Sequence, residues 1–372
     1  MAKLVFGKPK KSKERLLKSN MTKVYFLNSQ RPDSEGYVYV NVTKSPFEIG
    51  GIKHPSDNGN EFYRLDVNRR AEYSDNNRFL AECTAGACIR FSTDASSISV
   101  RLDMRSVIAG MHHFCDRGVY GIDAYIGTGT DRRYVGGQMQ TFADDIYYNS
   151  GILNLRDGVK EVMINLPLYG GVSKVEIGFP SGSRVGAPTK RAYAPIGFYG
   201  SSITQGGCVS RPANSYANII CRALDADCSN FGFSGSALGE LVVAEYIASR
   251  PMSCFVMDYD YNAPSVDHLR ETHRPFYELI RKARPDLPIV FVTHPYYFER
   301  TKADEERISV VRDTYEYALS KGDKLVRFVD SGSFFTKEMR DLYAVDILHP
   351  NDLGQMSMAE AIYPVVKELL VK

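Results

Sequence analysis

Apolar and polar residues tend to alternate through the first half of the chain, from about Gly36 to Val185. Alternation places every second side chain on one face of a β-strand, so these segments are predicted to be half-buried strands. The clearest examples are Val38-Tyr39-Val40-Asn41-Val42, Ile89-Arg90-Phe91-Ser92, Ile98-Ser99-Val100-Arg101-Leu102 and Val175-Glu176-Ile177-Gly178-Phe179. Turn-forming residues gather between such segments. Short alternating strands with few helical patterns predict an antiparallel β-sandwich.

After Pro195 the pattern changes to an apolar strand followed by a helix, repeated. The predicted strands are 196–199, a segment ending at 230–236, 254–257, 289–293 and 325–329. The predicted helices are one capped by Asn214, then 266–283, 303–320 and 352–370. This alternation predicts a doubly wound, mostly parallel sheet with helices on both faces, a flavodoxin-like α/β/α arrangement. Such sheets bind ligands at the carboxyl ends of their strands.

The chain has 372 residues, more than one ordinary domain, and its pattern changes near residue 190. We expect a basic tail over 1–35, a β-sandwich domain over 36–190 and an α/β domain over 191–372. The first 20 residues carry seven Lys and Arg against one acid. A solvated tail accounts for that composition better than a nucleic-acid-binding arm does.

The 46 basic and 44 acidic residues give a net charge of +2, which provides no general attraction to nucleic acid or an anionic membrane. No run of 18 apolar residues predicts a transmembrane helix, and no apolar segment follows the basic start as in a secretory signal. A cytoplasmic protein is therefore expected, and a processed secreted chain stays open. The seven cysteines form no Cys-x-x-Cys pair, so we expect reduced, buried thiols, with a Cys83–Cys88 bridge left open.

Residues that could carry out acyl transfer follow three of the predicted strands. In Gly200-Ser201-Ser202-Ile203-Thr204, the turn would expose the Ser202 hydroxyl above the sheet and direct its N–H toward a developing oxyanion. In the run 230–236, glycine lets the backbone approach a ligand. Beyond the third strand, the Asn262 amide can donate into the same cleft or form an Asx-turn before Pro264. Each feature alone is also explained by an ordinary turn or helix cap.

A fourth segment, Asp346-Ile347-Leu348-His349, lies near the C-terminus. An Asp three residues before a His can orient the imidazole as a general base, although one such pair also arises by chance on a surface. Together the four segments favour a hydrolytic site. Thr204 stands where the α/β-hydrolase elbow requires a second glycine, which disfavours that fold.

Along the chain, these four segments supply Ser, Gly, Asn and then Asp with His. In this order the C-terminal half resembles the SGNH/GDSL hydrolases over roughly 194–366. The turn around Ser202 looks like the family's first block, Ser234-Gly235 like the second, Asn262 like the third, and Asp346 with His349 like the last. The resemblance implies a triad of Ser202, His349 and Asp346. It also implies an oxyanion hole made of the Ser202 and Gly235 N–H groups and the Asn262 amide.

Two positions depart from the family pattern. Ser201 replaces the usual Asp before the nucleophile, and the third block lacks the usual Gly-x-Asn-Asp form. Both departures resemble a subfamily that has a β-sandwich with a Gly-x-Asp-Leu-Tyr motif before the hydrolase. Gly121-Ile122-Asp123-Ala124-Tyr125 is similar to that motif, so the resemblance extends over about 36–366.

Other polar residues are secondary candidates. Arg211, His113 and His294 are possible substrate-binding residues. For Arg211 a structural salt bridge is an equal alternative, and for His113 a surface or interdomain hydrogen bond. His294 is a weaker rival base because no Asp lies near it in sequence, and Cys208 is a rival nucleophile that a buried thiol explains better. No metal site and no cofactor are expected, since no Walker loop, His-Glu-x-x-His or dinucleotide fingerprint occurs.

The function that we predict is hydrolysis of a short-chain ester, with an acetylated carbohydrate as the substrate class that the resemblance implies. A thioesterase or lysophospholipase using the same triad is one alternative. A non-catalytic carbohydrate-binding protein on a degenerate hydrolase scaffold is another. The expected partner is a small-molecule or oligosaccharide ester, with neither nucleic acid nor membrane involved, and homo-oligomers stay open.

Overall fold

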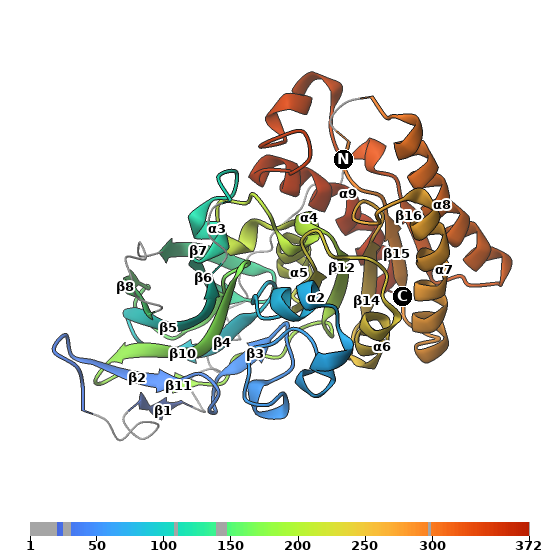
Figure 1. Ribbon diagram of the computed structural model, residues 1–372. Coiled ribbons are helices and arrows are strands. Elements are labelled where there is room, and N and C mark those ends of the chain that lie inside the picture. Colours follow the sequence, from blue (N-terminus) through green and yellow to red (C-terminus); the bar gives the residue numbers. More distant parts are fainter. Residues whose placement is uncertain (1–20, 25–30, 108–110, 139–146, 297–298, 372) are drawn as a thin grey trace.

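The computed structural model describes residues 21–24, 31–107, 111–138, 147–296 and 299–371. The first 20 residues, which make up most of the predicted basic tail, lie outside this range. In Figure 1 the strand-rich first half of the chain and the α/β second half lie side by side.

The first half contains two antiparallel sheets. Within the described residues, one has the order β1-β11-β4-β9-β6-β7, with β3 paired to β4, and the other has the order β2-β10-β5-β8. The strands of the first sheet are β1 (Thr22–Lys23), β3 (Glu48–Gly50), β4 (Cys88–Thr93), β6 (Ile122–Thr128), β7 (Asp131–Gln138), β9 (Lys160–Asn165) and β11 (Arg184–Gly186). Those of the second are β2 (Tyr37–Asn41), β5 (Ser97–Val107), β8 (Tyr147–Asn154) and β10 (Gly170–Pro180).

The apolar side chains of these two sheets form one core. Ile89 and Ile164 from the first sheet and Val100 and Ile177 from the second are all fully buried in it. Two sheets that bury their alternating apolar faces against each other form a β-sandwich, which confirms the predicted fold of this half. Short helices α2 (Asp75–Leu80) and α3 (Asp116–Val119) interrupt the strands.

The second half contains a parallel sheet of order β13-β12-β14-β15-β16. Its strands are β12 (Ile196–Gly200), β13 (Cys228–Gly232), β14 (Cys254–Asp258), β15 (Ile289–Val292) and β16 (Val326–Val329). The chain goes from β12 to β13 on one side and then crosses to β14 on the other. The order of the strands thus reverses at β12, and the carboxyl ends at such a switch point form the crevice in which α/β proteins bind ligands.

Helices cover both faces of this parallel sheet (Figure 1). On one face, α6 (Leu241–Ser249), α7 (Val266–Ala283) and α8 (Lys302–Ser320) pack against side chains such as Phe255 and Phe291. On the other face, α5 (Tyr216–Leu224) and α9 (Asp352–Leu370) pack against Phe198 and Val290. The predicted doubly wound α/β/α fold is therefore confirmed.

Two local details differ from the sequence-based prediction. The N-cap of α5 is Ser215, whose side chain accepts a hydrogen bond from the Asn218 N–H, and not Asn214, which lies in a 3-10 turn. Helix α6 was not predicted. It is apolar over most of its length and its N-cap, Glu240, makes no side-chain capping bond, so the usual start signal and polar face are weak.

A buried arginine joins the two halves at the edge strand β13. Arg64, 2% exposed, donates to the carbonyls of Asn230 and Gly232 on β13 and to those of Leu80 and Cys83 in the first half. Burial lowers the pKa of Arg64 to about 10, and the guanidinium still satisfies four backbone acceptors. The ends of β13 and the helical segment 75–80 are thus fixed relative to each other.

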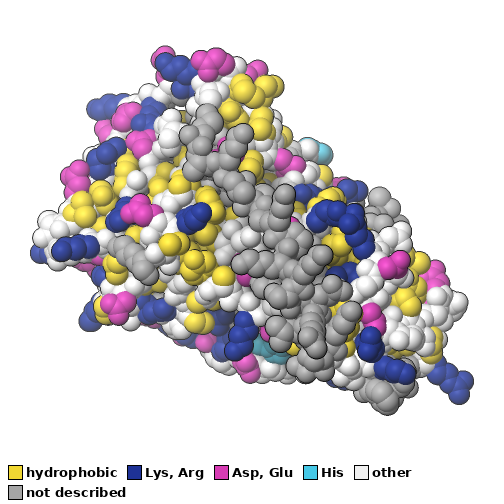
Figure 2. Space-filling model, turned by 180° about the vertical axis from the view of Figure 1, so that it is seen from behind, with side chains coloured by type: hydrophobic (Ala, Val, Ile, Leu, Met, Phe, Trp, Pro, Cys, Tyr) yellow, Lys and Arg dark blue, Asp and Glu magenta, His cyan; other side chains and the backbone are white. Residues whose placement is uncertain are grey.

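The charged surface, the helices and the cysteines can each be compared with what the sequence predicted. Acidic and basic side chains lie interspersed on the face seen in Figure 2. Among the described residues, no helix is long and apolar enough to cross a membrane. All seven cysteines are free, six of them buried, so Cys83 and Cys88 are not bridged; Cys115 is exposed.

Candidate active site

Ser202, His349 and Asp346 form a continuous hydrogen-bonded chain. The Ser202 Oγ lies 3.0 Å from the His349 Nε2, and the His349 Nδ1 lies 2.9 Å from the Asp346 Oδ2. An ionised carboxylate only accepts hydrogen bonds, so it holds the imidazole proton on Nδ1. The Nε2 lone pair is then left to accept the Ser202 proton. The three residues predicted from two segments 147 positions apart therefore meet in the arrangement of a nucleophile, a base and an orienting acid.

The turn after β12 fixes Ser202. Ser201 caps the short helix α4 (Ser202–Gln205) by accepting from the Ile203 N–H at 3.2 Å. Gly200 is tightly enclosed, because a Cβ there would lie 2.2 Å from the Thr204 Oγ1 and 2.3 Å from the Asp258 carbonyl oxygen. Ser202 is only 7% exposed. The strand end thus presents one hydroxyl at a packed edge of the sheet.

A tight turn before α9 holds the other two residues. The Asp346 Oδ1 accepts from the N–H groups of Leu348 and His349, at 2.7 and 2.6 Å. Burial acts to raise the pKa of Asp346, but these backbone bonds and the bond from the His349 ring outweigh it and hold the pKa below its ordinary value. The carboxyl group therefore stays ionised beside the imidazole well into the acid range.

Gly235 and Asn262 lie beyond the carboxyl ends of the neighbouring strands. Gly200 is in register with Gly232 on β13 and with Asp258 on β14, so the loops carrying Gly235 and Asn262 leave the same edge as Ser202. Gly235 has a φ of +66°, a conformation that favours glycine. The buried Asn262 Oδ1 has no hydrogen-bond partner within the described part of the chain. Their placement fits an oxyanion hole, and that role stays a prediction.

Asp258 is a residue at this edge to which sequence reasoning gave no role. Its Oδ2 accepts from the Thr204 hydroxyl at 2.9 Å and from the Tyr216 hydroxyl at 2.8 Å. Burial raises the pKa of Asp258 to about 7, and the nearby Asp260 carboxylate adds to the rise. Through Thr204, Asp258 is thus bonded to the short helix that Ser202 opens. The one available signal was an Asp at the end of a buried strand.

A loop of the sandwich domain reaches the triad. The rings of His113 and Phe114 lie 5.3 and 5.8 Å from the His349 ring, measured between centroids. Phe114 also packs on Tyr169, whose hydroxyl donates to the Ser202 carbonyl at 3.1 Å. The structure thus places the His113 ring against His349, and its contact with substrate stays a prediction.

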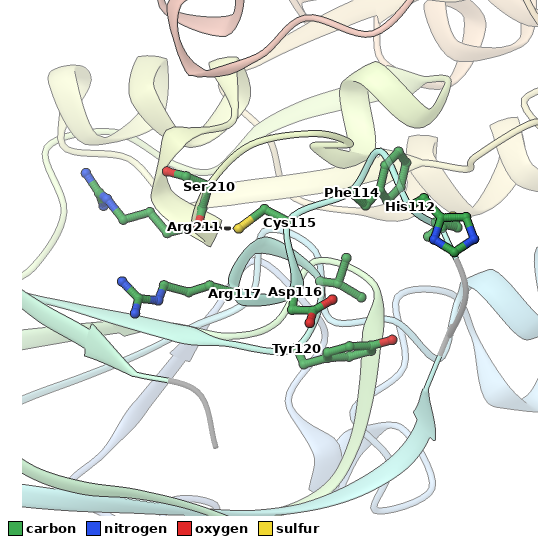
Figure 3. Close-up of a pocket in the computed structure, with 10 residues that line it drawn as sticks. His112, Phe114, Cys115, Asp116, Arg117, Tyr120, Ser210 and Arg211 are labelled. Carbon is green, nitrogen blue, oxygen red and sulfur yellow. Dashed lines mark hydrogen bonds between the residues drawn. The ribbon is translucent and has the colours of Figure 1, made fainter. Parts of the chain in front are cut away.

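Beside this loop lies a cavity of about 720 Å³ between the two halves (Figure 3). It is lined by Met111, His112, Phe114, Cys115, Asp116, Arg117, Val119, Tyr120, Ser210 and Arg211. In Figure 3 the Arg117 and Arg211 side chains extend at the end opposite His112. Phe114 links this mixed polar and apolar cavity to His349.

Arg211 is engaged in a salt bridge within the protein. Its guanidinium donates to the fully buried Asp123 at 3.0 Å and to the Tyr125 hydroxyl at 2.7 Å. Asp123 also accepts from the Ala213 N–H and from the Asn165 amide. The Asp and Tyr of the Gly-x-Asp-x-Tyr motif thus bind the loop that follows the nucleophile helix. This is the structural salt bridge left open as the alternative to substrate binding.

His294 has an acidic partner that the sequence did not reveal. Its Nδ1 lies 2.8 Å from the Asp260 Oδ2, and both side chains are almost fully buried. The Tyr296 hydroxyl lies 3.2 Å from the same nitrogen. The imidazole is therefore held among its own partners, and its contact with substrate stays a prediction.

Cys208 lies next to the triad but is not activated as a nucleophile. Burial, with a contribution from the Asp346 carboxylate, raises the pKa of Cys208 to about 12, so the reactive thiolate is disfavoured. Its backbone has a φ of +66°, unusual for a residue with a side chain. The ligand atoms of Cys208, His113 and His349 all lie within 4.8 Å of one another.

Residues 193–367 match the GDSL-like lipase/acylhydrolase family, and residues 37–185 match the N-terminus of SGNH-hydrolase-type esterases, called GxDLY. The chain is therefore an SGNH/GDSL-type protein. Its C-terminal part belongs to the GDSL-like lipase/acylhydrolase family, and the domain before it matches the GxDLY family, with Ala124 in the Leu position of the Gly-x-Asp-Leu-Tyr motif. No curated protein sequence matches the chain.

Solved structures share this two-part fold. A protein described as a GDSL-like lipase from Bacteroides ovatus ATCC 8483 is 23% identical with a TM-score of 0.77, covering 90% of this chain and 98% of that one. The salicylyl-acyltransferase SsfX3 of a tetracycline biosynthetic pathway is 16% identical, with a TM-score of 0.75 and coverages of 91% and 99%. An acetyl xylan esterase, Est2A, from Butyrivibrio proteoclasticus is 14% identical, with a TM-score of 0.55 and coverages of 90% and 98%. Together with the family, the esterases among such structures support an ester hydrolase.

Proposed function

We propose that the protein is a serine esterase that removes a short acyl group, acetate in the first instance, from a carbohydrate. The observation that carries this proposal is the unbroken chain of hydrogen bonds from Asp346 through His349 to Ser202. A polar arrangement of this kind at the switch point of a parallel sheet activates a hydroxyl and leaves it facing the ligand crevice.

In the proposed reaction, the Ser202 Oγ attacks the ester carbonyl carbon while the His349 Nε2 takes the hydroxyl proton. The negative oxygen of the tetrahedral intermediate is stabilised by the N–H groups of Ser202 and Gly235 and by the Asn262 amide. One such donor contributes roughly 3–4 kcal/mol to lowering the barrier. The alcohol leaves with the proton from His349, and an acyl-enzyme on Ser202 remains. Water, deprotonated by the same imidazole, then releases the acid and restores the serine.

Two features support a small acyl group and a polar alcohol. Ser202 is nearly buried beside the packed rings of Phe114 and Tyr169, which favours acetate over a long chain. The adjoining cavity combines the charged Asp116 and Arg117 with the Tyr120 ring, groups suited to sugar hydroxyls and sugar faces. The acetyl xylan esterase with the same fold supports this substrate class.

The test is hydrolysis of p-nitrophenyl acetate, butyrate and octanoate and of acetylated xylan by the wild type and Ser202→Ala. We expect acetate to be preferred and Ser202→Ala to be inactive. Ser181→Ala is the matched control, since it removes the hydroxyl of an exposed serine in the sandwich domain and leaves the Ser202 turn and its cap unchanged. A preference for octanoate would favour the lysophospholipase or thioesterase alternative. Glycan binding without turnover would favour the non-catalytic scaffold and contradict the proposal.

A further inference from the structure

A group of three side chains at the triad has the composition of a transition-metal site. The ligand atoms of His113, Cys208 and His349 lie within 4.8 Å of one another. Two imidazoles and a thiol are the ligands that Zn²⁺ prefers. We propose that the sandwich loop and the hydrolase domain together form a binding site for Zn²⁺ or a similar divalent transition metal, and that occupancy switches the esterase off.

The geometry needs only a small adjustment to bind metal. Around a tetrahedral Zn²⁺ with bonds of about 2.0–2.3 Å, ligand atoms lie about 3.4–3.7 Å apart. Since the three ligand atoms lie within 4.8 Å of one another, they must approach by at most about 1 Å. His113 is on an exposed loop and can supply that movement, while Cys208 is held in a left-handed backbone conformation beside the triad. Strained residues of this kind concentrate at functional sites.

The Asp346–His349 pair already has the form of a metal ligand with its supporting partner. Histidines that bind metal almost always donate their second ring nitrogen to a carboxylate or carbonyl, which fixes the tautomer. Asp346 holds Nδ1 at 2.9 Å and leaves Nε2 for the metal. The cavity of about 720 Å³ is lined by His112 and Phe114, the two residues that flank His113.

Binding and catalysis exclude each other because both use the same lone pair. When Nε2 coordinates the metal, it cannot accept the proton of the Ser202 hydroxyl, whose Oγ lies 3.0 Å from Nε2 in the metal-free protein. On coordination, the Cys208 thiol loses its proton to solvent and no electrons are transferred. The inference that bound metal inhibits hydrolysis rests on the proposed function, whereas the inference that the metal binds does not.

The experiment titrates Co²⁺ and Zn²⁺ into the full-length, chelator-treated protein. The wild type should show a thiolate-to-cobalt charge-transfer band and bind one Zn²⁺ by calorimetry. Cys208→Ala should lose the band, and both Cys208→Ala and His113→Ala should bind Zn²⁺ at least about tenfold more weakly. Cys115→Ala and His112→Ala are the matched controls for metal binding alone, and both should show the band and bind Zn²⁺ as tightly as the wild type does. Thermal melting checks that each variant is folded. If Cys208→Ala is unfolded, Cys208→Ser is used in its place.

In parallel, Zn²⁺ should inhibit hydrolysis of p-nitrophenyl acetate, with full recovery on adding EDTA. Relative to its own zinc-free rate, each ligand variant should need at least about tenfold more Zn²⁺ for half inhibition. The inference is overturned if the wild type gives no thiolate band, or if the ligand variants and their controls bind Zn²⁺ equally. A protein without esterase activity that still shows the band would contradict the proposed function and leave the metal site standing.

Discussion

The pKa values of two aspartates near Ser202 are shifted in opposite directions. Asp346 accepts three hydrogen bonds, which hold its pKa below the ordinary value, whereas burial raises the pKa of Asp258 to about 7. The difference follows from surroundings: one carboxylate faces N–H donors at a turn, and the other lies in the packed interior near a second acid. The first is suited to hold a charge next to His349, the second to accept hydrogen bonds from Thr204 and Tyr216.

Replacing Asp346 by Asn tests its orienting role. The amide would offer a donor to the His349 Nδ1 and favour the tautomer that carries its proton on Nε2, where the base is needed. We expect kcat on p-nitrophenyl acetate to fall by up to about 10⁴-fold, with little change in KM. Asp341→Asn, an exposed acid of the preceding segment, is the control. A loss below tenfold in Asp346→Asn would show that Asp346 does not orient the base.

Replacing Asp258 by Asn tests its raised pKa through stability. An unfolded Asp loses its proton near pH 4, whereas folded Asp258 keeps it up to about pH 7. The folded state therefore binds more protons in that window, and stability falls as pH rises through it. Asp258→Asn keeps an acceptor for Thr204 and Tyr216 and removes this dependence.

The measurement is the urea midpoint of unfolding at pH 5 and pH 8. The midpoint should fall between these two pH values more in the wild type than in Asp258→Asn. Asp75→Asn, at an exposed site, should behave like the wild type. Equal pH dependence in wild type and Asp258→Asn would contradict the raised pKa.

At the scale of elements, the end of β12 and the short helix after it create the site. Gly200 lets the strand end pass close to Thr204 and to the backbone of β14, and Ser202 then opens α4. The sequence predicted this strand and the turn, because a short apolar run, a Gly and a Ser-Ser pair stand next to each other. The catalytic roles of Ser202, His349 and Asp346 stay a prediction. It did not predict the contacts of Asp258 with Thr204 and Tyr216, or that of His294 with Asp260, because these partners lie 34 to 54 positions away in other segments and no short spacing encodes them.

Gly200→Ala should disturb this turn. The added Cβ would lie 2.3 Å from the Asp258 carbonyl oxygen, which is backbone and cannot move aside cheaply. We expect a loss of stability of about 1–3 kcal/mol and a loss of activity of about 100-fold, since small displacements of catalytic groups are costly. The control is Gly182→Ala, where a Cβ meets nothing within 4 Å. Denaturant unfolding and esterase assays on both variants measure these losses. Full activity in Gly200→Ala would show that the turn tolerates a Cβ at position 200.

At the scale of the whole molecule, the sandwich domain contributes directly to the site. Its His113–Phe114 loop contacts His349, and its motif residue Asp123 holds Arg211 in the loop after the nucleophile helix. The sequence predicted both folds from their period-two and strand–helix patterns. How the two halves pack could not be predicted, because Arg64, Asp123 and Arg211 bind partners up to 168 positions away.

Breaking the Asp123–Arg211 pair should therefore affect both stability and activity. Asp123→Ala removes the buried acceptor of Arg211 and of the Ala213 N–H. Loss of one partner of such a buried pair costs about 3–5 kcal/mol. We expect a lower melting temperature together with reduced esterase activity. Asp267→Ala, which breaks an exposed pair with Arg270, is the control and should change neither. An active, equally stable Asp123→Ala would show that the motif does not hold the site together.

In the proposed reaction, Ser202 is the residue that becomes acylated. The most direct measurement is labelling of the full-length protein with a fluorophosphonate, followed by peptide mass spectrometry. We expect one adduct, on Ser202, that is absent from Ser202→Ala and forms much more slowly in His349→Ala. An adduct on another serine or on Cys208, or equal labelling of Ser202→Ala, would contradict it.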